Sequence, residues 1–245
     1  FTITRSASCA VRDDDTVWCW GSVGLGALIP PVGGPDTPSA RQVMLGDAPF
    51  TAALIHSEDA NDSDRTPDFP IHVCAVRPDG SVWCWGRNTR GALGDGTTTD
   101  HATPAPVIEG TAPLRGAMTT RHSITGTCAL LADDTVRCWG DNQYGQVGDG
   151  TTTNRLTATT VLGPDGRPLD NVTQIASLGV FTRCALRRDG TLWCWGRNLA
   201  GELGDGTVTN RARATQVTCG ECTNSAECAI GPDAYSARGF AVCDV

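Results

Sequence analysis

Short runs in which apolar and polar side chains alternate recur along the chain, separated by turns rich in glycine, proline and aspartate. An alternation with a period of two predicts β-strands. In residues 184–195 one face would carry Cys184, Leu186, Leu192 and Cys194, and the other Ala185, Arg187, Thr191, Trp193 and Trp195. Because both faces carry bulky side chains, we expect sheets that are covered on both sides.

This unit reads as a β-hairpin and occurs four times, at residues 9–21, 74–86, 128–140 and 184–196. An Asp-Gly or Asp-Asp turn of three residues, whose last residue takes the left-handed conformation, would place the two cysteines of each copy opposite each other. We therefore predict the disulfides Cys9–Cys19, Cys74–Cys84, Cys128–Cys138 and Cys184–Cys194. Zinc or redox chemistry is the alternative, but a separation of ten positions fits no zinc-ligand pattern.

Each repeat contains material for about four strands. A glycine-rich loop follows three of the hairpins, at 86–96, 140–150 and 196–206. We expect a third strand in the apolar runs 103–107, 158–161 and 214–217, and a fourth before the first cysteine, as at 172–177. Four strands per repeat is the composition of a β-propeller blade, so the predicted fold is an all-β propeller.

The predicted organisation is four propeller repeats in residues 1–217, followed by a cysteine-rich segment. The repeats fall at about 1–45, 46–108, 109–162 and 163–217. Residues 218–245 are expected to be the start of a fifth repeat or a closing segment.

The glycine-rich loops carry the pattern Trp-Gly-x-Asn-x-x-Gly-x-Leu-Gly-x-Gly, at 85–96, at 139–150 with Val147 in place of leucine, and at 195–206. The pattern resembles the regulator of chromosome condensation repeat family over about residues 5–217, although the first copy lacks the asparagine and the Gly-Asp-Gly-Thr stretch. The resemblance implies a β-propeller, usually of seven blades. Family members include a nuclear exchange factor for a small GTPase, a bacterial protein inhibitor of β-lactamases, and secreted bacterial proteins.

The paired cysteines are similar to those of the secreted bacterial branch. Four repeats are too few for a seven-bladed ring, so we expect the chain to be part of a longer propeller. A small closed ring, in which the last strands complete the first blade, is the alternative.

Net charge and cysteine content limit the cellular location and the classes of partner that we expect. The net charge is −8, and all 19 basic residues are arginines scattered along the chain, which argues against nucleic acid and anionic lipid as partners. No apolar run approaches the roughly 20 residues that span a bilayer, so no membrane insertion is expected. Twelve cysteines, eight of them regularly paired, favour disulfides and hence an extracellular, cell-surface or periplasmic location.

The last four cysteines are Cys219, Cys222, Cys228 and Cys243. Cys219 and Cys222 form a CxxC motif, which could be a redox dithiol. We favour two further disulfides, whose connectivity the sequence leaves open.

Three kinds of candidate binding residue stand out. Asp95, Asp149 and Asp205 recur in the Gly-Asp-Gly-Thr loops and could bind calcium or sugar hydroxyls. We favour turn chemistry, in which the carboxylate accepts hydrogen bonds from nearby backbone N–H groups. Tyr144 is the one aromatic residue in the three matching loops and is the candidate for glycan contact. An acidic insertion contains the hard oxygen ligands Glu58, Asp59, Asn61, Asp62 and Asp64, which would suit calcium. We favour a solvated acidic loop over a calcium site.

No catalytic motif is present, and His56, His72, His101 and His122 are unrelated in spacing. The seven tryptophans occupy equivalent strand positions, which favours packing between blades over sugar stacking. We predict a non-enzymatic scaffold that needs no cofactor and binds a protein partner or itself. A carbohydrate-binding propeller is the first alternative, and an enzyme with its site in the central funnel is the second.

Overall fold

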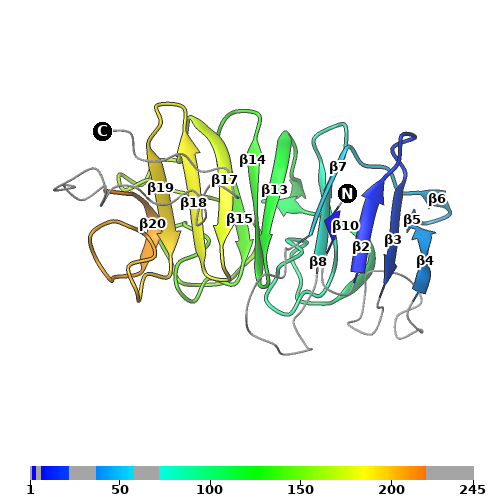
Figure 1. Ribbon diagram of the computed structural model, residues 1–245, viewed down its shortest axis with the longest axis horizontal. Helices are drawn as coiled ribbons and strands as arrows, with labels where there is room; N and C mark the ends of the chain where they lie inside the picture. The colour runs from blue at the N-terminus through cyan, green and yellow to red at the C-terminus, as the bar shows by residue number, and fades with distance from the viewer. Residues whose placement is uncertain (1, 4–6, 22–36, 58–71, 219–245) are drawn as a thin grey trace, which may run out of the picture.

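The computed structural model describes residues 2–3, 7–21, 37–57 and 72–218, and this part of the chain contains strands but no helix. Four antiparallel sheets of four strands follow one another along the sequence (Figure 1). No helix long and apolar enough to cross a membrane occurs in the described residues.

Each sheet is built from four strands in chain order. The first contains β1 (Thr2–Ile3), β2 (Ala7–Val11), β3 (Val17–Gly21) and β4 (Thr37–Gln42). The second contains β7 (Leu54–Ser57), β8 (His72–Val76), β9 (Val82–Gly86) and β10 (His101–Pro106). The third contains β13 (Ala117–Ser123), β14 (Gly126–Leu131), β15 (Val136–Gly140) and β16 (Arg155–Thr160). The fourth contains β17 (Val172–Leu178), β18 (Thr182–Arg187), β19 (Leu192–Gly196) and β20 (Arg211–Gln216).

Two short hairpins connect sheets: β5 (Met44–Leu45) with β6 (Ala48–Pro49), and β11 (Ile108–Glu109) with β12 (Ala112–Pro113). The first strands of successive sheets contact one another, β1 with β7, β7 with β13, and β13 with β17. They therefore lie on the side where the sheets converge, as the inner strands of propeller blades do.

The predicted hairpin register is confirmed. Cys184 pairs with Cys194, and the cysteines of the other three copies pair in the same way. The last turn residue has a positive φ in every copy, 62° at Asp15, 74° at Gly80, 62° at Asp134 and 84° at Gly190. Glycine and aspartate tolerate this conformation, which is why these two residue types end the turns.

The core lies between the sheets. At the boundary of the third and fourth sheets, Cys128, Leu130 and Val136 from one face pack against Ala185 and Trp195 from the next sheet. The boundary of the second and third sheets repeats this arrangement, with Cys74 and Cys84 packed in one cluster with Ala129 and Trp139. The prediction of sheets covered on both faces is therefore confirmed.

The last strand of the second, third and fourth sheets begins earlier than the sequence predicts. The apolar run at 158–161 predicts a strand there, whereas β16 begins at Arg155. Gly140 pairs with Arg155, and the register then shifts before Cys138 pairs with Thr159. A bulge of this kind breaks the alternation from which a strand start is predicted.

The expected repeat boundaries at about 1–45, 46–108, 109–162 and 163–217 remain a prediction. So does the role of segment 218–245, of which residues 219–245 lie outside the described residues.

Candidate functional site

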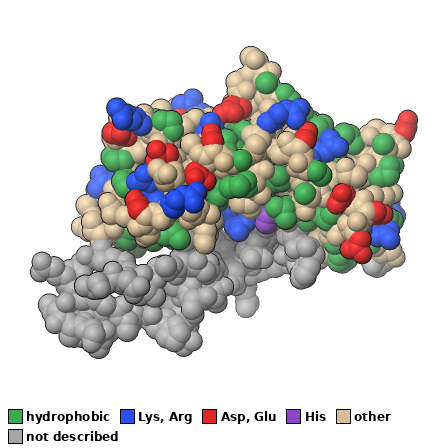
Figure 2. Space-filling model, turned by 90° about the horizontal axis from the view of Figure 1, so that it is seen from above, with side chains coloured by type: hydrophobic (Ala, Val, Ile, Leu, Met, Phe, Trp, Pro, Cys, Tyr) green, Lys and Arg blue, Asp and Glu red, His purple; other side chains and the backbone are tan. Residues whose placement is uncertain are grey.

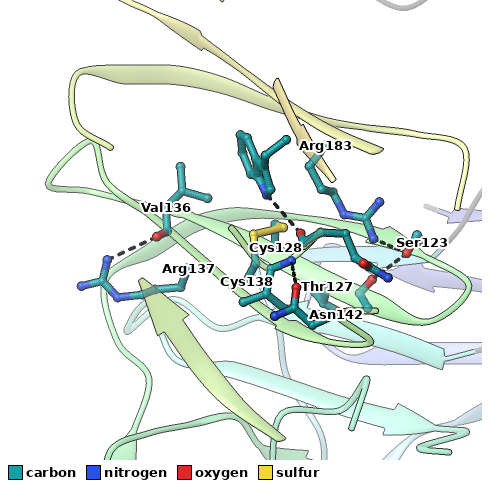
Figure 3. The surroundings of a disulfide bond; sticks show 12 residues. Ser123, Thr127, Cys128, Val136, Arg137, Cys138, Asn142 and Arg183 are labelled. Carbon is teal, nitrogen blue, oxygen red and sulfur yellow. Dashed lines mark hydrogen bonds between the residues drawn. A yellow bond between two sulfur atoms is a disulfide. The ribbon is translucent and has the colours of Figure 1, made fainter. Parts of the chain in front are cut away.

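Each of the four hairpins contains one disulfide: Cys9–Cys19, Cys74–Cys84, Cys128–Cys138 and Cys184–Cys194. The paired Cα atoms are 4.1 Å apart in all four, closer than in most disulfides. All eight residues are buried. Figure 3 shows the Cys128–Cys138 bridge between β14 and β15.

A fully buried asparagine organises each glycine-rich loop. The Nδ2 atom of Asn142 donates to the Thr151 carbonyl oxygen at 3.1 Å and to Asp149 Oδ1 at 3.3 Å. Its Oδ1 atom accepts from the Val147 backbone N–H at 2.9 Å. The second and fourth sheets repeat the arrangement with Asn88 and Asn198. The asparagine of the repeat pattern is therefore a loop organiser.

The recurring aspartates accept hydrogen bonds from their own loops. Asp205 Oδ1 accepts from the Thr207 backbone N–H at 3.0 Å, and Oδ2 accepts from Arg211 Nε at 2.7 Å. Burial alone would raise the pKa of Asp205, but hydrogen bonds from Thr207 and Arg211 outweigh it and lower the pKa to about 2. Asp149 has the equivalent donors Thr151 and Arg155. Asp95 accepts from Thr97, and His101 Nε2 lies 2.8 Å from Asp95 Oδ2 in the place of the arginine.

The aromatic candidates take part in packing. The Tyr144 ring is half-buried and meets the Phe181 ring edge-on, with centroids 4.9 Å apart. Trp85, Trp139 and Trp195 are completely buried between the sheets. The indole nitrogen of Trp195 donates to the Gln146 carbonyl oxygen of the preceding loop at 3.0 Å.

Two groups of candidate residues lie outside the described part of the chain. They are the insertion residues Glu58, Asp59, Asn61, Asp62 and Asp64, and the cysteines Cys219, Cys222, Cys228 and Cys243. The calcium and redox interpretations of these residues remain predictions.

Three histidines that the sequence does not connect lie together between the second and third sheets. His56 is in β7, His72 begins β8, and His122 is in β13. The His72 Nε2 and His122 Nδ1 atoms are 3.2 Å apart, and the two ring centroids are 5.1 Å apart. Both side chains are buried. We call His56, His72 and His122 the histidine cluster.

Threonines and an arginine surround this cluster. Thr127 Oγ1 lies 2.8 Å from His72 Nε2 and donates to the Ala92 carbonyl oxygen at 3.1 Å, so it accepts from His72. Thr120 Oγ1 lies 3.1 Å from His122 Nε2 and 3.4 Å from His56 Nδ1. Arg121 donates to His56 Nε2 at 3.2 Å.

The histidine cluster is uncharged at neutral pH. Burial, with a smaller effect of the positive charge of Arg183, lowers the pKa of His72 to about 4. Burial and then the Arg121 charge lower the pKa of His56 to about 4. The pKa of His122 is held well below its usual value by burial and by its histidine and arginine neighbours. Neutral imidazoles are available as hydrogen-bond partners or metal ligands.

A buried arginine extends the polar region toward the fourth sheet. Arg183 in β18 donates to the Ser123 hydroxyl, to the Val180 carbonyl oxygen at 3.2 Å and to the Thr182 carbonyl oxygen at 3.0 Å. Figure 3 shows the Arg183 guanidinium reaching Ser123 from the neighbouring sheet.

The cluster departs from the repeat, which is the signal that could have found it. The position two before the first cysteine holds Ala7, His72, Gly126 and Thr182 in the four copies. His122 pairs with Thr127 in β14, and Ser177 occupies the equivalent place in β17, paired with Arg183. A comparison of the copies singles out His72, but the approach of His122 depends on how the sheets pack.

A second departure lies on the glycine-rich loop of the fourth sheet. Leu199 is 63% exposed and Val208 is 66% exposed. The equivalent residues are polar in the other two loops, Thr89 and Thr98 in one and Gln143 and Thr152 in the other. On the face of the molecule in Figure 2, basic and acidic side chains are intermingled with apolar ones.

Comparison with known proteins agrees with the repeat pattern. Residues 79–116, and residues 125–146 with 172–202, match family models described as the Regulator of chromosome condensation (RCC1) repeat. A Protein RCC2 homolog of Danio rerio is 30% identical over 154 residues, which cover 60% of this chain and 29% of that protein. The Ultraviolet-B receptor UVR8 of Arabidopsis thaliana is 27% identical over 216 residues, which cover 87% of this chain and 44% of that protein. The chain thus spans less than half the length of these relatives.

Solved structures show the same fold. Human WBSCR16 superposes with a TM-score of 0.67 at 18% identity, covering 88% of this chain and 50% of that one. Yeast RCC1 (Prp20), in its complex with Kap60, superposes with a TM-score of 0.64 at 18% identity, and the match covers 90% of this chain and 49% of that one. The four-stranded sheets are therefore blades of an RCC1-like β-propeller. The loop pattern, its buried asparagines and the matches above together show that the chain contains repeats of the regulator of chromosome condensation (RCC1) type.

Proposed function

We propose that this chain is part of an exported, bacterial-type propeller that binds another protein through its glycine-rich loops and catalyses no reaction. The observation that carries the proposal is the pair of exposed apolar side chains, Leu199 and Val208, at loop positions where the other copies are polar. Apolar side chains presented on a surface are typical of the centre of a protein–protein interface.

The loop beneath these side chains is cross-linked by hydrogen bonds from a buried asparagine. Asn198 is fully buried and donates to Asp205 at 3.1 Å and to the carbonyl oxygens of Thr207 and Thr209, both at 3.1 Å. A loop held in one conformation loses less entropy on binding than a mobile loop. Yeast RCC1, which has the same fold, is seen in complex with the protein Kap60. We take that complex as support for a protein partner here.

The disulfides support an exported location. Four hairpin disulfides occur in the described residues, and such bonds persist in extracellular and periplasmic compartments but are rare in the cytosol. Intact mass of the natural protein, measured with and without a reductant, tests this point. Native protein with free thiols throughout would contradict export.

The binding surface is tested by exchanging residues between loops. The Leu199→Thr/Val208→Thr double variant takes its side chains from the equivalent positions of the second sheet. A partner is first isolated from the native source by cross-linking to the wild-type chain, and its affinity is then measured with both purified proteins. We expect the double variant to bind at least about tenfold more weakly, the loss expected on removing one interface hot spot.

The matched control is Gln143→Ala/Thr152→Ala, at the same positions of the third sheet, which should bind the partner with wild-type affinity. Equal loss in both double variants, or in neither, would rule out the fourth-sheet loop as the binding surface. Binding on a glycan array without a protein partner would instead favour the carbohydrate-binding alternative, and turnover of a substrate would overturn the non-enzymatic proposal.

A further inference from the structure

The histidine cluster has the spacing of a metal site. Two nitrogen ligands at 2.0–2.1 Å from a tetrahedral zinc ion lie about 3.3 Å apart. His72 Nε2 and His122 Nδ1 are 3.2 Å apart, so both could bind one ion with little movement. The two residues come from different sheets, His72 from β8 and His122 from β13.

Cys74 completes the set of potential ligands. It lies two positions after His72 in β8, so both side chains are on the same face of the strand. The ligand atoms of His72, Cys74 and His122 all lie within 4.8 Å of one another, and the three side chains are buried. In the structure, however, Cys74 Sγ is bonded to Cys84. A disulfide sulfur carries no charge, and the thiolate is the form that binds metal.

We propose that reduction of the Cys74–Cys84 disulfide creates a zinc site in which Cys74, His72 and His122 are the protein ligands. The disulfide takes two electrons and two protons from a dithiol, which is itself oxidised to a disulfide. The S–S bond breaks, and each sulfur becomes a thiol. The Cys74 thiol then releases its proton to solvent as the sulfur binds Zn²⁺. His72 gives up its hydrogen bond to Thr127, its ring proton is exchanged from Nε2 to Nδ1, and Nε2 binds the ion. His122 binds through the lone pair of Nδ1. The fourth tetrahedral position is taken by water.

The surroundings of the two imidazoles suit this role. His122 Nε2 lies 3.1 Å from Thr120 Oγ1, which leaves Nδ1 directed at His72 and free to bind the ion. A hydrogen bond to the second ring nitrogen is the usual support of a histidine ligand. One thiolate and two imidazoles form a donor set that suits zinc.

Charge makes the site dependent on reduction. Two arginines lie beside the cluster, since Arg121 donates to His56 and Arg183 donates to Ser123, the neighbour of His122 in the chain. A zinc ion held by imidazoles alone would add two positive charges beside these arginines. The thiolate of Cys74 removes one of them, so we expect zinc to bind the reduced protein and not the oxidised one.

The other three disulfides have no equivalent pair of histidines. At the Cys128–Cys138 bridge the place of His72 is taken by Gly126, and Ser177 in β17 takes the place of His122. This bridge is therefore a matched control, with the same geometry and burial but without the imidazoles.

The test frees one cysteine at each bridge without a reductant. The Cys84→Ser variant leaves Cys74 as a thiol, and the Cys138→Ser variant leaves Cys128. Zinc affinity is measured by competition with a chromophoric chelator, and Co²⁺ is used as a spectroscopic probe of thiolate ligation. We expect Cys84→Ser to bind one zinc ion more than about 100-fold more tightly than Cys138→Ser, which exceeds the usual effect of a residue that only supports a ligand.

Adding His122→Ala to Cys84→Ser should remove most of this advantage and the thiolate–cobalt absorption band. Equal zinc affinity in Cys84→Ser and Cys138→Ser would mean that the ion follows any free thiol, and the proposal would be wrong. No zinc in Cys84→Ser would overturn it as well.

Wild-type protein provides a second test that does not depend on the folding of a variant. After treatment with a phosphine reductant, zinc is counted by native mass spectrometry. One tightly held ion in the reduced protein and none in the oxidised protein is the expected result. No ion in the reduced, folded protein, or one in both states, contradicts the proposal.

Discussion

The indole nitrogen of Trp139 donates a hydrogen bond of 2.8 Å to the carbonyl oxygen of Ala92, in the glycine-rich loop of the preceding blade. Trp195 makes the same contact one blade later, with the Gln146 carbonyl oxygen at 3.0 Å. In the third and fourth sheets, the tryptophan of the repeat pattern thus links the sheet to the loop of its predecessor, in addition to filling the core.

Trp195→Phe should destabilise the protein more than Trp139→Phe. Both changes remove the same atoms from a buried position, but the Ala92 carbonyl oxygen also accepts from Thr127 Oγ1 at 3.1 Å. The Gln146 oxygen would lose its tryptophan donor and become a buried, unsatisfied acceptor, which costs about 1–3 kcal/mol. The free energy of unfolding in urea measures the difference. Equal losses would show that packing alone determines the contribution of these tryptophans.

Asn142→Ala should destabilise the third glycine-rich loop. The amide is fully buried and hydrogen-bonds to Asp149, to the Thr151 carbonyl oxygen and to the Val147 N–H. We expect a loss of about 3 kcal/mol, because several buried polar groups lose their partner at once. Gln143→Ala, at an exposed position of the same loop, should change the free energy of unfolding by less than about 0.5 kcal/mol. A comparable effect of the two variants in chemical denaturation would refute this role for Asn142.

Gly94→Ala should cost more than Gly110→Ala, although both glycines have a positive φ, 71° and 62°. A Cβ atom at Gly94 would lie 2.7 Å from Trp139 Nε1, whereas one at Gly110 would meet no atom within 4 Å. Gly110→Ala therefore measures the backbone strain alone, about 1–2 kcal/mol. Gly94→Ala adds about 1–3 kcal/mol of overpacking. Thermal unfolding of the two variants provides the comparison, and identical midpoints would contradict the close approach of Trp139.

Stability should fall in acid, in part because of Asp205. The pKa of its carboxyl is lowered from 3.8 to about 2 in the folded protein. A carboxyl with a lower pKa in the folded than in the unfolded state stabilises the protein above pH 3.8, and this contribution is lost as the pH falls toward 2. Because Arg211, the charged partner, is 38% exposed, we expect only about 1 kcal/mol.

The test compares urea unfolding of wild type and Asp205→Asn at pH 6 and at pH 2. Asp205→Asn should be less stable by about 1 kcal/mol at pH 6 and close to wild type at pH 2. Asp79, whose pKa is also lowered to about 2, is present in both proteins and cancels in the difference. A gap between the two proteins that stays constant with pH would refute the contribution of the Asp205 charge.

The sequence was sufficient to predict the blade. Cysteines ten positions apart around a turn that ends in Asp15, Gly80, Asp134 or Gly190 determine one register, and strict alternation then assigns every side chain to a face. These features are local, so no knowledge of the neighbouring blades was needed. The starts of the fourth strands were missed because a bulge next to Gly140 shifts the pairing.

The histidine cluster could not be predicted in the same way. His72 and His122 are 50 positions apart, and their contact depends on the packing of β8 against β13. The acidic insertion near residues 57–65 separates His56 from His72 in the sequence, which hides their relation as neighbours on the paired strands β7 and β8. Contacts between blades are long-range properties, and the repeat predicts them only where the copies agree.

Every disulfide of the described residues joins two strands of a single sheet, so within this part of the chain no disulfide links one blade to the next. A pulling force on the ends would therefore separate blade from blade while each hairpin stayed closed. The bonded cysteines are ten positions apart, so each disulfide prevents about 34 Å of chain per blade from extending, at about 3.4 Å per residue. With the disulfides intact, each blade that unfolds would therefore add less length to the extended chain. Reduction of the disulfides would restore the missing length.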